Sequence, residues 1–401
     1  MRRYKRTRQM LGTVAILFFI WTYGQFALLP SEFVMVRGQT HSLPTFVAPS
    51  SNEGGFLWQK KGTETALLPT EAGSFSLDYT TFGLLRKTAT VHVVEPQEVV
   101  AGGETVGIKM YMEGVLVVAL SEIPNTGRAP GKEAGIMAGD RILSVNGAPL
   151  SGSDALERAV EESAGAALIL SVCRGEDTWE TALSPVYYAD AAVYKIGLWV
   201  RDSEAGIGTL TFSLPESGKY AALGHAIEDA DTGTAISSAR GSITDCEIVY
   251  IAKGEDGAPG AVRGVFGEEK GSIGANTPYG LYGTLHTPEG GERIPLGVST
   301  QVKKGEAIIQ SDIAGGAPES YAIEIERILH RKNPGSKSMV VRITDERLLS
   351  LTGGIIQGMS GSPIIQNGRL VGAVTHVFVH DPTRGYGIFI ENMLSETEKV
   401  G

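Results

Sequence analysis

Short apolar runs bounded by glycine or other turn residues dominate the chain from about residue 98 onward. Buried strands are predicted at 115–120 (VLVVAL), 168–172, 208–212, 248–252, 294–300, 307–311 and 337–343. Residues 88–94 (TATVHVV) alternate as a further strand would. Beyond residue 196 no long amphipathic helix is visible, apart from a short helical turn near 346–351. The pattern predicts a mostly β chain, with a pair of β-barrels in its C-terminal half.

A helix is predicted at residues 153–162, where Leu156, Ala159 and Val160 fall on one face and Ser153 is a suitable N-cap. It follows residues 134–147 (AGIMAGDRILSVNG), which contain a strand and end in an Asn-Gly hairpin signal. The order is therefore strand, hairpin, helix and strand, an α+β arrangement.

The amino terminus combines a basic flank with an apolar stretch. The first eight residues carry five positive charges, and the apolar run 10–21 (MLGTVAILFFIW) continues, with polar breaks, to about residue 29. Nineteen residues from 11 to 29 approach the roughly 20 needed to span a bilayer, so residues 1–30 are predicted to be an uncleaved membrane anchor that exports the body of the protein. A cleaved signal peptide is the alternative. Residues 31–96 are either a linker or a small β region of unknown role.

Composition narrows the functional classes. The 401 residues allow two or three domains, and 52 glycines suit a turn-rich chain. The net charge is −10, but beyond the basic flank 30 basic residues face 45 acidic ones, which argues against binding nucleic acid. Two cysteines exclude a disulfide framework. Neither is a good nucleophile, because Cys173 lies in an apolar strand and Cys246 lacks a glycine turn.

The sharpest chemical signal is the sequence Gly-Met-Ser-Gly-Ser-Pro at residues 358–363. A nucleophilic serine needs a tight turn with free backbone N–H groups nearby to hold the oxyanion, and the glycines on either side of Ser360 allow such a turn. Ser362 is a rival nucleophile, but it precedes a proline and has no glycine two positions before it.

A serine nucleophile also needs a base and an orienting acid. His225, beside a glycine and 135 residues before Ser360, is the preferred base; His286 is the runner-up, and His376 suits an ordinary strand role better. Asp345, 15 residues before Ser360, is one candidate acid. The residues alone leave it level with Asp229, Asp231 and Asp312.

Residues 134–147 resemble the hallmark stretch of PDZ domains of the bacterial protease type. Such domains bind an extended peptide as an added strand, with a helix as the other wall of the groove. The resemblance implies a groove between the strand at 114–120 and the helix at 153–162, lined by Gly114, Val115, Leu116, Val117, Leu156 and Val160.

The C-terminal half closely resembles the stage IV sporulation protein B peptidase family of endospore-forming bacteria. The resemblance rests on residues 196–212 (IGLWVRDSEAGIGTLTF), 224–227 (GHAI), 279–286, 343–345 and 352–387. It implies a chymotrypsin-like double β-barrel with a His225, Asp345 and Ser360 triad. The oxyanion hole would be the N–H groups of Gly358 and Ser360, and no metal or cofactor would be needed.

The same resemblance implies a signalling serine endopeptidase of the forespore membrane, with its body exported into the intermembrane space. It would cleave itself and the membrane-bound regulatory subunit of the complex that processes pro-sigma-K. The expected domains are a PDZ domain at 97–186 and a peptidase domain at 190–401. A non-enzymatic PDZ adaptor is the alternative.

Overall fold

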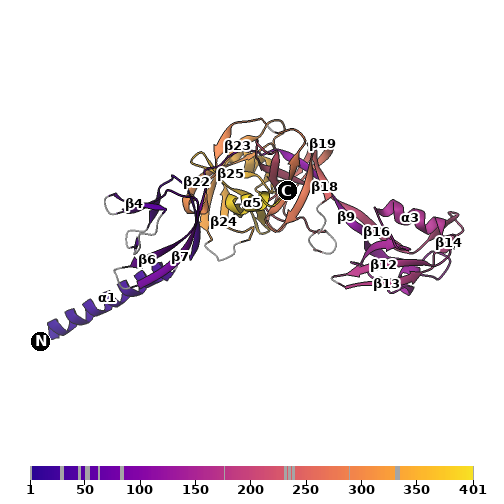
Figure 1. Cartoon of the computed structure of the whole chain (residues 1–401), viewed down its shortest axis with the longest axis horizontal. Coiled ribbons are helices and arrows are strands. Elements are labelled where there is room, and N and C mark those ends of the chain that lie inside the picture. Colours follow the sequence, from indigo (N-terminus) through magenta and orange to yellow (C-terminus); the bar gives the residue numbers. More distant parts are fainter. Residues whose placement is uncertain are drawn as a thin grey trace.

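The molecule is elongated, with an N-terminal helix and β region at one end, two barrels in the middle and a separate α+β unit at the other end (Figure 1). The structure is a computed structural model. It describes residues 2–27, 31–43, 47–49, 55–61, 64–81, 85–175, 177–229, 233, 236, 240–288, 290–329 and 335–400.

The first barrel is a ring of six antiparallel strands. In order around the ring these are β9 (Thr105–Leu120), β18 (Arg240–Ala252), β19 (Ala261–Thr277), β20 (Gly280–Leu285), β17 (Lys219–Ala222) and β16 (Leu198–Ser213). Pairing between β9 and β16 closes the ring. Alternate residues of these strands, such as Val106, Ile108 and Ile243, fill the interior. Two short strands, β8 (Glu98–Ala101) and β21 (Arg293–Pro295), extend the sheet beyond β16.

The second barrel is also closed and six-stranded. Its strands, in order, are β22 (Gly305–Ser311), β23 (Glu319–Ile328), β24 (Met339–Ile343), β27 (Asp381–Phe389), β26 (Arg369–Phe378) and β25 (Pro363–Gln366). Its interior includes Ile309, Ile325 and Val374. Two helices, α4 (Glu346–Thr352) and α5 (Ile390–Thr397), accompany it. The predicted pair of barrels is therefore present.

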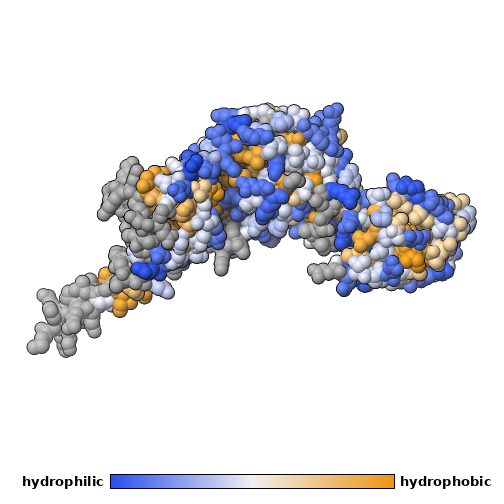
Figure 2. All heavy atoms as spheres, viewed as in Figure 1, coloured by the Kyte–Doolittle hydropathy of each residue, from blue (hydrophilic) through white to orange (hydrophobic). Residues whose placement is uncertain are grey.

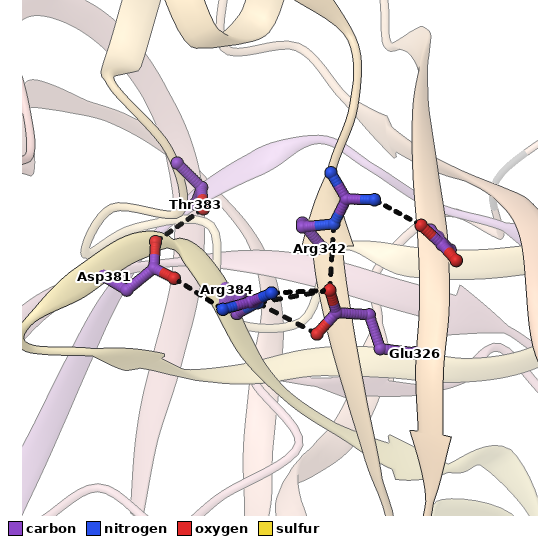
Figure 3. A network of polar contacts seen from close by, with 6 residues as sticks. Glu326, Arg342, Asp381, Thr383 and Arg384 are labelled. Carbon is purple, nitrogen blue, oxygen red and sulfur yellow. Dashed lines mark hydrogen bonds and ion pairs between the residues drawn. The ribbon is translucent and has the colours of Figure 1, made fainter.

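A polar network on the outside of the second barrel ties three of its strands together (Figure 3). Glu326 of β23 accepts hydrogen bonds from Arg342 of β24, at 2.9 Å, and from Arg384 of β27, at 3.0 Å. Asp381 in turn pairs with Arg384 at 3.1 Å. The Glu326 carboxylate is shared by the two neighbouring arginines and offsets the repulsion between their charges. These contacts stabilise the pairing of β23, β24 and β27.

The α+β unit is inserted into the first barrel rather than preceding it. Its elements are α2 (Pro130–Glu133), β10 (Arg141–Val145), β11 (Ala148–Pro149), α3 (Ser153–Glu162), β12 (Leu168–Arg174), β13 (Asp177–Leu183), β14 (Val186–Tyr188) and β15 (Val193–Lys195). The long strands β9 and β16 run through both the barrel and this unit (Figure 1). Residues 98–113 consequently belong with the first barrel and its sheet, not with the domain predicted at 97–186. The sequence does not show the boundary between the barrel and the inserted unit, because the two halves of each long strand have similar patterns of apolar and polar residues.

Local predictions within the inserted unit hold well. The helix forms at Ser153–Glu162, and the Asn146-Gly147 turn, with φ of 49° and 78°, joins β10 to β11. The predicted N-cap is wrong. Gly152 holds that position, and the capping acceptor is Asp202 of β16, whose Oδ2 accepts from the backbone N and the Oγ of Ser153 at 2.7 and 2.8 Å.

The predicted peptide groove is closed. The 114–117 segment of β9 pairs with β10 on one side and with β16 on the other. Buried positions include every residue assigned to the groove: Gly114, Val115, Leu116, Val117, Leu156 and Val160. These residues are core rather than binding surface, because the returning strand β16 occupies the edge at which a peptide would add.

Residues 31–96 form a packed β region in the part that the structure describes. One sheet contains β1 (Glu32–Val36), β7 (Leu85–Val94), β6 (Gly73–Thr81) and β3 (Val47–Pro49); the other contains β2 (His41–Leu43), β5 (Glu64–Pro69) and β4 (Phe56–Lys61). Met35, Leu67 and Val91 are among the buried residues between them. The linker alternative is thus replaced by a small β region.

The N-terminal helix α1 (Arg2–Ala27) forms where the apolar stretch predicts it. Large apolar side chains such as Phe19 and Trp21 are exposed on its surface. Orange, hydrophobic atoms are visible where this helix is not grey (Figure 2). Among the described residues, no helix is both long enough and apolar enough to cross a membrane.

Candidate active site

Ser360 lies on a glycine turn of the second barrel that is clamped to strand β16 of the first. Thr209 donates through its Oγ1 to the carbonyl of Gly358 and through its backbone N to the carbonyl of Ser360, both at 2.8 Å. Gly358 and Gly361 have φ of +106° and +99°, a region that only glycine adopts readily. The turn therefore has the sharp geometry predicted from its sequence, and Ser360 is half-buried on it.

Two backbone N–H groups on this turn, those of Gly358 and Ser360, have no hydrogen-bond partner among the described residues. The N–H groups of Gln357, Met359 and Gly361 donate to the carbonyls of Gly260, Ile356 and Val374, respectively, at 2.8 to 3.1 Å. Those of Gly358 and Ser360, the residues in alternation with them, have no acceptor among the described residues. Two N–H donors without an acceptor beside a serine are what an oxyanion hole requires.

His225 reaches the same region from a turn at the end of β17. Leu223 and Gly224 have positive φ, of 69° and 73°, and the Leu223 backbone N donates to the Thr209 carbonyl at 3.3 Å. The Gly224 backbone packs against Thr375 of β26. A single residue of β16, Thr209, is thus bonded to both the serine turn and the histidine turn.

The tautomer of His225 follows from its neighbour. Nδ1 lies 2.7 Å from the carbonyl oxygen of Ala226, and since a carbonyl can only accept, Nδ1 carries the proton and Nε2 the lone pair. Burial lowers the pKa of His225, although the Ala226 carbonyl and the Glu228 carboxylate act in the opposite direction. A neutral ring with a free Nε2 is the form that a general base requires.

Ser360 and His225 are not hydrogen-bonded in this conformation. The Ser360 Oγ donates instead to the carbonyl of Thr375 at 2.8 Å. Thr375 is the residue against which the histidine turn packs, so the two side chains lie in adjoining segments. Catalytic hydrogen bonds are often absent without substrate, and rotation about χ1 of the serine releases its hydroxyl from the carbonyl.

A second histidine adjoins the first. His376 follows Thr375 on β26, and its ring centroid lies 5.0 Å from that of His225, with 42° between the ring planes. The His376 Nδ1 atom is buried and has no hydrogen-bond partner among the described residues. Burial, then the neighbouring charges of His225 and Lys337, lowers the pKa of His376 to about 4. Sequence reasoning assigned His376 an ordinary strand role, because the pattern of β26 alone does not show which residues face it.

Asp345 does not meet His225. It is the N-cap of α4, where its carboxylate accepts from the backbone N atoms of Arg347 and Leu348 and from that of Ala322. Side-chain hydrogen bonds from Arg347 lower its pKa further.

Strand register explains the separation of the predicted acid from the base. Tyr386 of β27 pairs with His376 on one side and with Val340 on the other. Asp345 lies five residues beyond Val340 and outside β24, which ends at Ile343 before the chain enters α4. The geometry therefore gives no support to the prediction that Asp345 orients the base.

The other predicted alternatives also have separate roles. Asp229 is buried in an ion pair with Arg201, and Asp312 accepts hydrogen bonds from Thr105. His286 lies on the surface and contacts Glu269 at 3.1 Å. Asp231 falls outside the described residues.

The rival nucleophile and the cysteines remain unsuited to catalysis. Ser362 is fully buried and faces no base, since its Oγ has no partner in the described part of the chain. Cys173 is buried, and burial raises the pKa of the Cys246 thiol. No group of three or more potential metal-ligating side chains occurs among the described residues.

Several solved structures are similar to the chain, and two of them are of Rv3671c. The structure titled Rv3671c protease, inactive form, has 13% identity and a TM-score of 0.28, covering 49% of this chain and 84% of that one. The serine-to-alanine mutant of Rv3671c from M. tuberculosis H37Rv, also an inactive form, has 12% identity and a TM-score of 0.27, covering 48% of this chain and 82% of that one. No curated protein matches the chain. Residues 192–394, just over half of the sequence, match the family described as SpoIVB peptidase S55, and this segment contains both the Ser360 turn and the His225 turn. The chain therefore belongs to the SpoIVB peptidase S55 family and is a serine peptidase.

Proposed function

We propose that this serine peptidase is an endopeptidase in which Ser360 is the nucleophile and His225 the general base. The Ser360 Oγ attacks the carbonyl carbon of a peptide bond while its proton passes to Nε2 of His225. The same nitrogen then donates that proton to the departing amine, and water repeats the sequence to release the acyl group. The tautomer of His225, with its proton on Nδ1, suits this role.

The free N–H groups of Gly358 and Ser360 would hold the oxyanion of the tetrahedral intermediate. They are fixed before substrate arrives, because Thr209 and the neighbouring hydrogen bonds hold the turn. Preorganised donors of this kind account for roughly 10²–10³ in kcat per donor. This unpaired pair of donors beside Ser360 is the single observation that carries the proposal.

A fluorophosphonate probe, which reacts with activated serines, tests the assignment without knowledge of the substrate. We expect the full-length chain to be labelled and Ser360→Ala to lose all labelling. Ser362→Ala is the matched control, since this serine is two residues away but buried, and its variant should be labelled like the wild type. Both variants should fold, as shown by unchanged circular dichroism.

Two results would contradict the proposal. Labelling that persists in Ser360→Ala would place the nucleophile elsewhere. A folded wild-type chain that resists labelling across neutral and alkaline pH would favour the alternative, a non-enzymatic adaptor.

The substrate proposal follows from family membership. We propose that the protein cleaves itself and a membrane-bound regulator of the complex that processes pro-sigma-K, after export from the forespore into the intermembrane space. Sequencing the amino terminus of the mature wild-type and Ser360→Ala proteins tests self-cleavage. A new amino terminus found in the wild type alone supports it, and identical termini would contradict it.

The inserted unit is proposed to be a PDZ-like peptide-binding module that uses a different edge from the one predicted. The start of β16, at residues 198–202, pairs only with β9 among the described strands and lies beside α3. Trp199 on this segment is 64% exposed. An extended peptide added along this free edge would meet α3 as its second wall.

A further inference from the structure

One edge of β16 runs from the inserted unit to the serine turn. Residues 198–208 of this strand pair with β9 and with no other described strand. At its start β16 lies beside α3, and at Thr209 it is bonded to the turn that carries Ser360. The edge opposite β9 therefore connects the two places at which the proposed function requires a peptide to bind.

The backbone of this edge is available for strand addition. Thr209 directs both its N–H and its carbonyl away from β9, toward the serine and histidine turns. This direction alternates along an antiparallel pair, and the register from 203 to 209 contains no bulge. Ile207, Ala205 and Ser203 therefore direct their N–H and carbonyl groups to the same side as Thr209. Those groups have no backbone partner in the part of the chain that the structure describes.

The edge is open to solvent beside the serine turn. Ala205 and Gly206 are exposed, and no atom lies within 4 Å of the missing Cβ of Gly206. The side chain of Ile207 reaches the turn itself, since its Cγ2 lies 3.6 Å from the position that a Cβ of Gly358 would occupy. A peptide leaving the turn would thus pass directly onto β16.

We propose that the polypeptide on the carboxyl side of the scissile bond adds to β16 as an antiparallel strand, and that its continuation enters the inserted unit beside α3. The inference rests on the proposed roles of Ser360, His225 and the inserted unit. It defines the substrate as an extended, unfolded segment that occupies the active site and the inserted unit at the same time.

The direction of this segment follows from the chemistry. His225 must protonate the departing amine, and it comes from the first barrel, on the turn after β17. The half of the substrate that begins with that amine consequently lies toward the first barrel, and β16 is the strand of this barrel that holds the serine turn. From Thr209 the open edge leads toward lower residue numbers, so a chain that runs away from the bond is antiparallel to β16.

The two ends of the edge set a length requirement. Trp199, which is 64% exposed, lies ten residues before Thr209. Ten residues of extended chain cover about 33 Å. A β-bulge between Arg201 and Ser203 bends the strand on the way and changes the count by about one residue. A substrate must therefore continue for roughly 8 to 12 residues beyond the scissile bond to reach the inserted unit.

Main-chain hydrogen bonds supply most of this recognition, which makes it tolerant of sequence. The charged side chains along the edge already have partners, because Arg201 pairs with Glu204 and with Asp229. Selection then depends on the length and extension of the substrate. A chain held by the inserted unit also has a high effective concentration at Ser360, so long substrates should be cleaved faster than short ones.

Unfolded, carboxymethylated casein is the probe, because recognition of the backbone requires no particular sequence. Mass spectrometry of a brief digest by the full-length chain identifies a cleaved bond, and peptides are made around that bond. Their amino sides are constant, and their carboxyl sides have about 4, 8, 12 or 16 residues. We expect kcat/KM to rise at least about tenfold between the shortest and the third peptide and then to level off. Peptides lengthened only beyond about eight residues on the amino side should stay within about twofold of one another.

Ala205→Pro tests the edge itself. Proline removes an N–H on the open edge, whereas the bonds to β9 come from the neighbouring residues and remain. We expect the advantage of the long peptides over the shortest to fall to about twofold or less. Ala205→Val is the matched variant, since it keeps the N–H and should keep the dependence on length.

Three results would overturn the inference: equal rates across the carboxyl series, a rise on the amino side instead, or an unchanged dependence on length in Ala205→Pro. A wild type that is labelled by the fluorophosphonate but cuts no bond of casein would also overturn it, because an open strand edge should accept an unfolded chain. If Ala205→Pro does not fold, the wild-type series still decides. Failure of the proposed function is distinct, since it would abolish labelling of the wild type.

Discussion

Individual glycines determine whether the turn around Ser360 can form. A Cβ atom at Gly361 would lie 2.1 Å from the carbonyl oxygen of Thr209 and 2.6 Å from the Leu223 backbone N. These are the atoms through which β16 holds the histidine turn. The close approach of three backbone segments therefore requires glycine at position 361, beyond the requirement set by its φ of +99°.

We expect Gly361→Ala to lower the free energy of unfolding by about 3 kcal/mol, from backbone strain and from displacement of Thr209. Gly368→Ala is the control, because Gly368 also has a positive φ of 70° but has nothing within 4 Å of its missing Cβ. That variant should lose only about 1 kcal/mol. Urea unfolding measures both, and equal losses would show that the contact with Thr209 is unimportant.

At this scale the sequence predicted the glycine turn around Ser360 but not the residues that pack against it. The glycines on both sides of Ser360 are needed because the backbone there has positive φ. A requirement of this kind can be recognised from neighbouring residues in the sequence. Whether Asp345 or His376 adjoins His225 depends on the register of β24, β27 and β26. That register is set by packing of the whole barrel.

Helix α3 is held by a residue from another element. Asp202 of β16 accepts two hydrogen bonds from Ser153 at the start of the helix, and these bonds lower the pKa of the Asp202 carboxyl. The helix thus depends on β16, the same strand that joins the inserted unit to the barrel. Its sequence predicts its bounds, but not this dependence.

We expect Asp202→Ala to lower the stability of the inserted unit by about 1 to 2 kcal/mol, as for loss of an N-cap. Asp202→Asn keeps an acceptor and should lose less. Because the folded-state pKa is lowered, the stabilisation is present above the ordinary aspartate pKa and is lost as the pH falls below it. Amide hydrogen exchange of α3 is the measurement, and equal exchange in wild type and Asp202→Ala would contradict this role.

At the scale of the whole molecule, His41 connects the N-terminal β region to the segment that precedes the second barrel. Nδ1 of His41 lies 3.1 Å from Oγ1 of Thr300, which donates to the Val34 carbonyl, and the Val36 backbone N donates to Nε2 at 3.4 Å. Thr300 belongs to the short helix η1 (Ser299–Gln301). Burial lowers the pKa of His41 to about 4.

Acidification should weaken this junction. The folded form binds the His41 proton less readily than the unfolded form, so stability is full above pH 6.5 and is lost as the pH falls toward 4. Over that window the loss is about 3 kcal/mol, because each unit of pKa shift corresponds to about 1.4 kcal/mol. A proton on Nε2 would also face the Val36 N–H, donor against donor.

Hydrogen exchange of β1 and β2 at pH 7 and pH 5 tests the junction. We expect faster opening of these strands at pH 5 in the wild type, after correction for intrinsic exchange. His41→Gln, which cannot be protonated, should remove most of the difference. An unchanged pH dependence in that variant would assign the effect to another group.

The sequence by itself determined the features that depend on neighbouring residues. The bounds of α3, the hairpin at Asn146-Gly147, the glycine turn around Ser360 and the mostly β character all follow from local backbone preference and the alternation of apolar side chains. The quoted motifs were also sufficient to indicate the family, which the match over residues 192–394 shows.

Only the tertiary structure decided what lies opposite each of these features. In the tertiary structure the predicted groove strand pairs with β16, and residues 98–113 belong to the first barrel and its sheet. Asp202 caps α3, and His376 rather than Asp345 lies beside His225. Each of these contacts joins residues that are distant in sequence. Their geometry is fixed by strand register and barrel closure, which arise from packing over the entire domain and leave no trace in any short segment.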